Sequence, residues 1–344
     1  MASDPLLVYG AYGYTGELVA RRALERGLRP VLGGRDRRKL EPLARTLGLE
    51  WRAFGVEGMR TVQRNLGGAK VVLHCAGPFA DTFRPVVEAC LASGAHYLDL
   101  TGEIPVFQAI AAMGPAAEKA GLMLLPGAGF DVVPTDCLAA HLVRRLPSAT
   151  SLTLAFRGLS RLSRGTARTM MRQLAGGAPP PRPRKQPAVR SFDLGDGPVA
   201  CFSIPWGDLA TAPRTTGVQD VAVYVPPPSG ATGMKLLPLL APLARIPFLR
   251  DLGARLLTGG EAGPTPEERA RGGTAMYGEA LDASGRKVAA RQKLPEPYVL
   301  TALAAIEIAE RALRGDVKPG WQTPGSAYGP DLVTALPGCS REEL

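Results

Sequence analysis

The chain has few of the side chains that build disulfide frameworks and metal sites. Its 344 residues include three histidines and five cysteines, and the cysteines are scattered without Cys-x-x-Cys spacing: Cys75, Cys90, Cys137, Cys201 and Cys339. An odd number of unspaced cysteines argues against a disulfide framework, and the shortage of thiol and imidazole ligands argues against a zinc site. We therefore expect no metal and a reducing compartment, the cytoplasm.

Aromatic residues and long apolar runs are also scarce. Phe, Trp and Tyr make up 6% of the chain, and none interleaves with its arginine-rich stretch, so nucleic acid is a poor explanation of the net charge of +10. An anionic small molecule, an acyl carrier or a membrane surface fits that charge better. The first residues show no basic-then-apolar leader, so we expect no secretion.

The most apolar segment, residues 233–257, is interrupted by prolines and charged residues. These interruptions exclude an ordinary membrane-spanning helix. We expect a proline-kinked core or lid segment. The alternatives are a wall for a hydrophobic substrate and a contact with a membrane surface.

The chain contains one informative glycine-rich motif, LLVYGAYGYTGELVARRALERG, over residues 6–27. Its apolar start predicts a strand, and the apolar spacing after residue 14 predicts a helix. Between them, Gly10 suits a sharp turn, Gly13 the approach of phosphates to the backbone, and Gly16 close packing of helix on strand. A turn built for packing alone is the alternative. The motif predicts a dinucleotide site to which Gly10, Tyr12, Gly13, Tyr14, Thr15 and Gly16 contribute.

The sequence LRPVLGGRDRRKL, over residues 28–40, bears on which nucleotide fits. Its apolar part predicts a second strand. In dinucleotide folds an acid after this strand binds the ribose 2'-hydroxyl, whereas arginine accommodates a 2'-phosphate. Here Gly34 is followed by Arg35, and Lys39 belongs to a run of cations that opens the next helix, where the helix dipole disfavours positive charge. A solvated charge run is the alternative. We predict NADP(H) as the cofactor, with Arg35 and Lys39 among its ligands.

Strand and helix patterns alternate up to residue 145, which is typical of a Rossmann-type, doubly wound parallel sheet in an α/β protein. From residue 150 onward, short strand candidates indicate a second α/β domain of mainly antiparallel sheet. A helix with a broad apolar face is predicted over residues 297–314, and we expect it to pack on the first domain. The predicted domains are an NADP-binding domain over residues 1–148, completed by residues 297–344, and an inserted second domain over residues 149–296.

Three motifs follow the predicted parallel strands at the edge where such sheets bind ligands: HCAGPFADT, HYLDLTGE and PGAGFDVVPTD. In the first, Ala76, Gly77 and Pro78 offer carbonyl groups and little bulk beside a nicotinamide ribose. A plain turn is the alternative.

Reduction of a carbonyl, imine or enoyl group also needs a proton donor. The sequence offers four candidates and singles out none: Tyr97, Asp99, Glu103 and Asp131. Asp99 and Glu103 either orient the substrate or cap the next helix, and Asp131 either caps its helix or helps to form a floor under the nicotinamide. His96 begins its strand, away from the ligand edge, and we expect it to be structural, with an acid catalyst as the alternative.

Taken together, GAYGYTGELVA, GGRDRRKL, CAGPF, HYLDLTGE, GFDVVPTD and the later GPTPEERARGG resemble the saccharopine dehydrogenase-like oxidoreductases, in particular the branch of trans-acting enoyl reductases of lipid biosynthesis. The motifs are dense over residues 6–136 and sparse beyond. The resemblance implies a Rossmann domain, a second α/β domain before a C-terminal return, NADP(H) and often an acyl or lipid-linked substrate. It supplies no settled catalytic residue.

We therefore expect an NADPH-dependent oxidoreductase that acts on a hydrophobic acyl or isoprenoid-like enoyl substrate. The arginines between residues 157 and 172 form either a solvated face or a dock for the phosphate of an acyl carrier. Reduction of an imine or amino-acid conjugate, and a non-catalytic NADP(H)-binding role at lipids, remain alternatives. A peripheral membrane contact and a homodimer also stay open.

Overall fold

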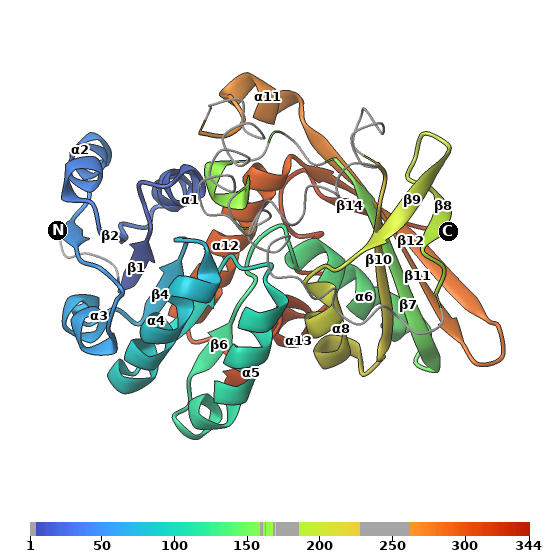
Figure 1. The fold of residues 1–344 in the computed structure, drawn as a ribbon, viewed down its shortest axis with the longest axis horizontal. Helices are drawn as coiled ribbons and strands as arrows, with labels where there is room; N and C mark the ends of the chain where they lie inside the picture. Colours follow the sequence, from blue (N-terminus) through green and yellow to red (C-terminus); the bar gives the residue numbers. More distant parts are fainter. Residues whose placement is uncertain (1–4, 159–160, 162, 168, 170–185, 228–261) are drawn as a thin grey trace, which may run out of the picture. The chain divides into compact units, whose positions relative to one another are not determined.

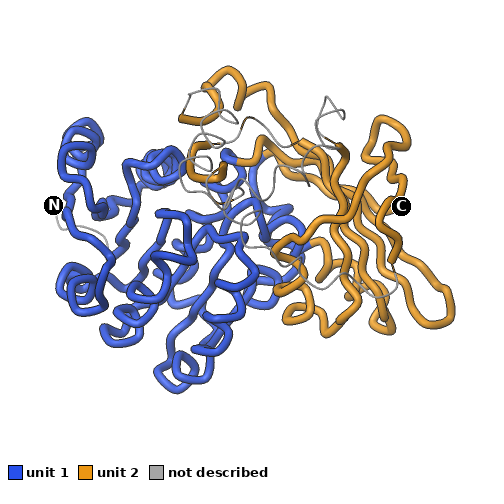
Figure 2. The backbone as a smooth tube through the Cα atoms, in the orientation of Figure 1, with its two compact units in different colours: residues 1–137, 298–337 blue, residues 138–297, 338–344 orange. Residues whose placement is uncertain are grey.

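The computed structural model describes residues 5–158, 161, 163–167, 169, 186–227 and 262–344. The chain forms two compact units, coloured separately in Figure 2. Unit 1 contains residues 1–137 and 298–337, and unit 2 contains residues 138–297 and 338–344. The chain thus leaves unit 1 within helix α6 (Val133–Arg145) and re-enters it at the start of helix α12 (Pro297–Leu313), both labelled in Figure 1. The division into an NADP-binding domain (residues 1–148 and 297–344) and an inserted second domain (residues 149–296) remains a prediction.

Unit 1 is built on a seven-stranded parallel sheet of order β13-β6-β5-β4-β1-β2-β3. This arrangement confirms the predicted Rossmann-type sheet, whose strand order reverses between β1 and β4. The strands are β1 (Leu6–Tyr9), β2 (Val31–Gly34), β3 (Trp51–Ala53), β4 (Val71–His74), β5 (His96–Asp99), β6 (Met123–Leu125) and β13 (Gly320–Trp321). The helices are α1 (Tyr14–Glu25), α2 (Arg37–Leu47), α3 (Met59–Leu66), α4 (Phe79–Ser93), α5 (Ile104–Lys119), α12 (Pro297–Leu313) and α13 (Pro324–Tyr328). Helix α6 (Val133–Arg145) begins in unit 1 and lies mostly in unit 2.

The central strands β1 and β4 are apolar except for the terminal His74, as expected for parallel strands buried on both faces. Every residue of β1 and of β4 is buried. One large core cluster includes Val72 and Tyr97 from the sheet and Phe83, Val87 and Ile110 from helices α4 and α5. Helices α4 and α5 therefore fix the carboxyl ends of β4 and β5, where the predicted ligand edge lies.

Unit 2 is built on a mixed sheet of order β14-β12-β11-β7-β10-β9-β8. The pair β7 and β10 is parallel and the other pairs are antiparallel, so the predicted mainly antiparallel sheet is confirmed. The strands are β7 (Ala149–Arg157), β8 (Val189–Asp193), β9 (Pro198–Ile204), β10 (Asp220–Val225), β11 (Gly273–Asp282), β12 (Lys287–Pro295) and β14 (Ser340–Glu343). The helices are α8 (Asp208–Thr216) and α11 (Pro266–Arg271).

Helix α6 packs closely on this second sheet. A Cβ atom on Gly278 of β11 would lie 2.8 Å from side-chain carbons of both Leu138 and Leu142. Glycine therefore allows the close approach of helix to strand at this point. In the described parts of the chain, no helix combines the length and hydropathy needed to cross a lipid bilayer.

Candidate cofactor and active site

The turn between β1 and α1 has the geometry of a phosphate cradle. Gly10 adopts a left-handed backbone conformation with φ of 83°, and a Cβ atom there would lie 2.8 Å from the amide nitrogen of Ala76. A Cβ atom on Gly16 would lie 2.2 Å from the carbonyl oxygen of Gly10. Gly13 is the N-cap residue of α1, and no side chain caps this helix. The backbone amides at the positive end of α1 are thus presented for an anion, and a pyrophosphate fits this cradle.

The end of β2 forms the neighbouring side of the cradle. The carbonyl of Gly33 accepts hydrogen bonds from the amides of Gly10 and Ala11, at 2.8 and 3.1 Å. The ring of Tyr12 lies against Gly34, where a Cβ atom would come within 2.5 Å of a ring carbon. The ammonium of Lys39 lies 5.9 Å from the centre of the same ring. Tyr12 and Lys39, both predicted from sequence, therefore lie together next to the predicted 2'-phosphate position.

The cations that open α2 differ in their partners. Asp36 caps the helix by accepting a hydrogen bond from the amide of Arg38, at 3.0 Å, and this cap offsets the unfavourable placement of the cations. Arg37 pairs with Glu41 at 3.2 Å, and Lys39 pairs weakly with Asp36 at 3.8 Å. The guanidinium of Arg35 is exposed and meets no hydrogen-bonding or ion-pair partner among the residues that the structure describes. Arg35 is therefore available for a 2'-phosphate.

The predicted loop Ala76–Gly77–Pro78 follows β4 and is held by Thr82. The hydroxyl of Thr82 donates to the carbonyl oxygens of Ala76, at 2.8 Å, and Pro78, at 3.2 Å. It accepts in turn from Nε2 of His74, at 2.9 Å. This arrangement keeps the loop carbonyls oriented at the carboxyl edge of the sheet.

Sequence reasoning missed His74. Its side chain is fully buried, and burial lowers its pKa to about 3, so the imidazole is neutral and donates through Nε2. Tyr9 and Phe79 contact the ring, with centroids 5.5 and 5.4 Å away. The available signal was a histidine at the end of an otherwise apolar strand.

Two of the four catalytic candidates are fully buried and bonded to each other. The hydroxyl of Tyr97 donates a hydrogen bond to the carboxylate of Asp99, at 2.7 Å. Asp99 also accepts from the amides of Thr101 and Gly127, both at 2.9 Å. Burial raises the pKa of Asp99 to about 6 against the opposing effect of these hydrogen bonds. Asp99 therefore ties the end of β5 to the loop after β6, which favours a structural role.

The other two candidates lie in the same region. Glu103 precedes α5, yet its carboxylate accepts from the amides of Phe79, at 2.7 Å, and Ala80, at 3.3 Å, and so caps α4. Asp131 is partly buried, and a Cβ atom on Gly102 would lie 2.7 Å from its Oδ2. Burial, followed by the charge of Glu103, raises the pKa of Asp131 to about 6. Asp131 thus combines partial exposure with a pKa close to neutral.

His96 was expected to be structural, and its Nδ1 accepts a hydrogen bond from the amide of Met123, at 3.0 Å.

In unit 2, two arginines of the basic stretch are ion-paired: Arg157 with Asp196, and Arg161 with Glu268 at 3.0 Å. Arg168 and the segment 233–257 lie outside the described residues. In the parts that the structure describes, no cluster of side chains suits a metal ion.

The sequence has recognisable relatives. Residues 6–125 match the family described as the saccharopine dehydrogenase NADP binding domain. A trans-acting enoyl reductase of Mycobacterium leprae is 32% identical over 149 residues, 41% of this chain and 36% of that protein. A protein of Mycobacterium tuberculosis named for the same activity is 30% identical over 248 residues, 64% of this chain and 58% of that protein. The chain therefore spans well under two thirds of the length of these relatives.

Solved structures with the same fold have very different sequences. Saccharopine dehydrogenase (L-Glu forming) from Saccharomyces cerevisiae superposes with a TM-score of 0.68 at 12% identity and covers 100% of both chains. Homospermidine synthase from Legionella pneumophila, solved in complex with NAD, gives a TM-score of 0.65 at 9% identity over 99% of this chain and 92% of that one. At these identities the likeness establishes the fold alone.

Proposed function

We propose that this chain is an NADPH-dependent reductase of a hydrophobic, acyl or isoprenoid-like enoyl substrate. The match of residues 6–125 to the saccharopine dehydrogenase NADP binding domain supports this proposal. This match supports the resemblance inferred from the sequence motifs and the NADP(H) cofactor, and the enzyme class is part of the proposal. The substrate and the reacting group are also part of the proposal.

One observation carries the cofactor part of the proposal. The glycine cradle at the start of α1 has no room for a Cβ atom at Gly10 or Gly16, and the exposed Arg35 lies at the end of the adjacent strand. The α1 amides would hold the pyrophosphate, Arg35 the 2'-phosphate, and the Ala76–Pro78 loop would border the nicotinamide ribose. When bound, NADPH supplies a hydride.

The proton is proposed to come from Asp131. Among the four candidates, Tyr97, Asp99 and Glu103 are buried, whereas Asp131 is partly exposed. A carboxyl with a pKa of about 6 is partly protonated near neutral pH and can therefore act as a general acid. Its position after β6 lies on the half of the sheet that borders the nicotinamide.

The substrate class rests on two supports. The relatives are named as trans-acting enoyl reductases, a name that suits a substrate presented on a separate carrier. The apolar segment 233–257, outside the described residues, has the composition of a wall for a hydrophobic chain. We place the protein in the cytoplasm, with a peripheral membrane contact and a homodimer as proposals that solution measurements would test.

The test is a comparison of NADPH oxidation with enoyl thioester, imine and aldehyde substrates. We expect turnover with the enoyl thioester, and Asp131→Asn should reduce kcat while leaving NADPH affinity unchanged. Turnover confined to an imine of an amino acid would replace the enoyl proposal with the imine alternative. NADPH binding without turnover of any substrate would favour the non-catalytic alternative.

A further inference from the structure

Helix α12 begins with two side chains that contact different parts of the candidate cofactor site. Tyr298 and Thr301 are three residues apart, which places them on one face of the helix. The ring of Tyr298 meets that of Tyr14 edge-on, with centroids 5.0 Å apart and planes at 86°. The hydroxyl oxygen of Thr301 accepts a hydrogen bond from the amide of Phe130, at 3.1 Å. Tyr298 and Thr301 are both more than nine-tenths buried.

The two contacted elements belong to the cradle and to the loop that carries Asp131. Tyr14 is the first residue of α1, directly after the N-cap Gly13. Phe130 lies in the loop of residues 127–131. Gly129 of this loop also packs on Thr301, because a Cβ atom there would lie 2.9 Å from Cγ2 of Thr301. A single turn of α12 therefore braces both the phosphate cradle and the loop on the nicotinamide half.

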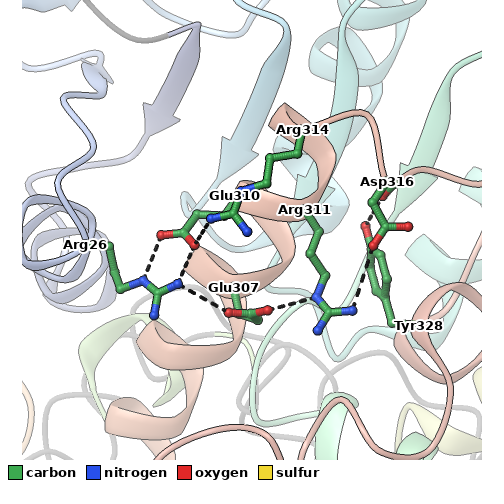
Figure 3. A network of polar contacts seen from close by, with 7 residues as sticks. All are labelled: Arg26, Glu307, Glu310, Arg311, Arg314, Asp316 and Tyr328. Atoms are coloured by element: carbon green, nitrogen blue, oxygen red, sulfur yellow. Dashed lines mark hydrogen bonds and ion pairs between the residues drawn. The ribbon is translucent and has the colours of Figure 1, made fainter.

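The far end of α12 is fixed to the far end of α1. Arg26, one residue beyond α1, donates two hydrogen bonds to the carboxylate of Glu310, and Figure 3 shows both. From Tyr14 to Arg26 and from Tyr298 to Glu310 each helix advances by twelve residues, about 18 Å. The two helices thus run side by side in the same direction, joined at both ends. The contacts of Tyr298 and Thr301 hold the first turn of α12, and the Arg26–Glu310 pair holds its far end.

We propose that Tyr298 and Thr301 are positioning residues for the nicotinamide half of bound NADP(H). They set the distance between the phosphate cradle and the 127–131 loop through their contacts with Tyr14 and Phe130. The inference rests on the cofactor site of the proposed function. It makes a prediction that does not depend on the identity of the substrate.

The experiment compares two ligands by titration calorimetry: NADPH, and adenosine 2',5'-bisphosphate, which lacks the nicotinamide half. Thr301→Val keeps the shape of the side chain but removes the acceptor for the Phe130 amide, and we expect NADPH binding about 5- to 10-fold weaker. Tyr298→Leu removes the ring edge, and we expect binding about 3- to 5-fold weaker. Thr301→Val should bind the bisphosphate as the wild type does. Tyr298→Leu should lose less affinity for the bisphosphate than for NADPH, because Tyr298 also contacts Tyr14 at the phosphate cradle. Thr301→Ser, which keeps the hydroxyl acceptor for the Phe130 amide, is the matched control and should bind both ligands normally.

Arg35→Ala and Glu310→Gln complete the comparison. Arg35→Ala should weaken both ligands, because its target is the shared 2'-phosphate. Glu310→Gln should lower the free energy of unfolding without the selective loss of NADPH affinity. Unchanged NADPH affinity in Thr301→Val and Tyr298→Leu would overturn the inference, as would equal losses for both ligands in step with stability. Failure of the wild type to bind either ligand would instead overturn the proposed cofactor site.

Discussion

Replacement of Glu310 tests how the C-terminal helix is held to the cofactor domain. The Glu310 side chain is 4% exposed and accepts hydrogen bonds from Arg26, whose side chain is 39% exposed, at 2.8 and 2.5 Å. Loss of a partner from a fully buried ion pair costs about 3 to 5 kcal/mol. Because water can reach Arg26 once its partner is gone, we expect a smaller loss, about 1.5 to 3 kcal/mol for Glu310→Ala. The contact with Arg314 adds little, since that side chain is 70% exposed.

The assay is urea unfolding of the single variants and of Arg26→Gln combined with Glu310→Gln. We expect a coupling energy of about 1 kcal/mol or more between the two sites. Glu307→Gln is the control: its carboxylate lies 3.7 Å from Arg26, and the change should cost less than about 0.5 kcal/mol. A coupling energy near zero would refute the view that this pair fastens α12 to α1 (Figure 3).

The same pair predicts a pH dependence with a defined sign. Bonding to Arg26 lowers the pKa of Glu310 below its ordinary value of 4.5. The stabilisation is therefore complete above pH 4.5 and is lost as the pH falls through the lower pKa of the folded state. The stability difference between the wild type and Glu310→Gln should shrink over that acidic range. A difference that grows there would contradict the assignment.

Four further predictions concern the cofactor and active site. Arg35→Ala should reduce the preference for NADPH over NADH by about 1.5 to 3 kcal/mol, measured as the ratio of Kd values. Gly16→Ala should abolish NADPH binding, because its Cβ atom would lie 2.2 Å from the Gly10 carbonyl oxygen; normal affinity would exclude this cradle. If Asp131 donates the proton, kcat should fall as the pH rises above about 6, and Asp131→Asn should lose this dependence. Burial lowers the pKa of His74 in the folded protein to about 3, so the imidazole is protonated at a higher pH in the unfolded chain than in the folded chain. Between pH 6.5 and 4.5, the wild type should therefore lose about 2 kcal/mol more stability than His74→Gln.

The parallel sheet was predictable from sequence because its signals are local. Each strand of unit 1 from β1 to β6 is followed by a helix, and β1, β4 and β6 are largely apolar runs. The glycine turn after β1 has its own spacing. The strands that sequence reasoning missed lack such signals. Strand β14 consists of Ser340–Glu343, polar residues paired on one side with β12, and β13 is only two residues long. Such segments are extended because they pair with a neighbouring strand, and not because their own sequence favours a strand.

The roles of the acidic residues were not predictable for a different reason. Asp99 and Glu103 were expected either to orient substrate or to cap the helix that follows. Glu103 instead caps α4, whose first residue Phe79 lies 24 positions earlier, and Asp99 holds Gly127, 28 positions later. The Thr301 contact with Phe130 spans 171 positions. Contacts between residues so far apart in sequence depend on the strand order of the sheet. Local sequence patterns do not contain that information.

Transfer of deuterium from (4-²H)NADPH to enoyl thioesters of increasing chain length tests the central claim most directly. We expect one deuterium at the β-carbon of the saturated product by mass spectrometry. We also expect kcat/KM to rise with chain length, by up to about fourfold per methylene if each is fully buried, at about 0.8 kcal/mol. Deuterium transfer to an imine of an amino acid and to none of the enoyl thioesters would contradict the account.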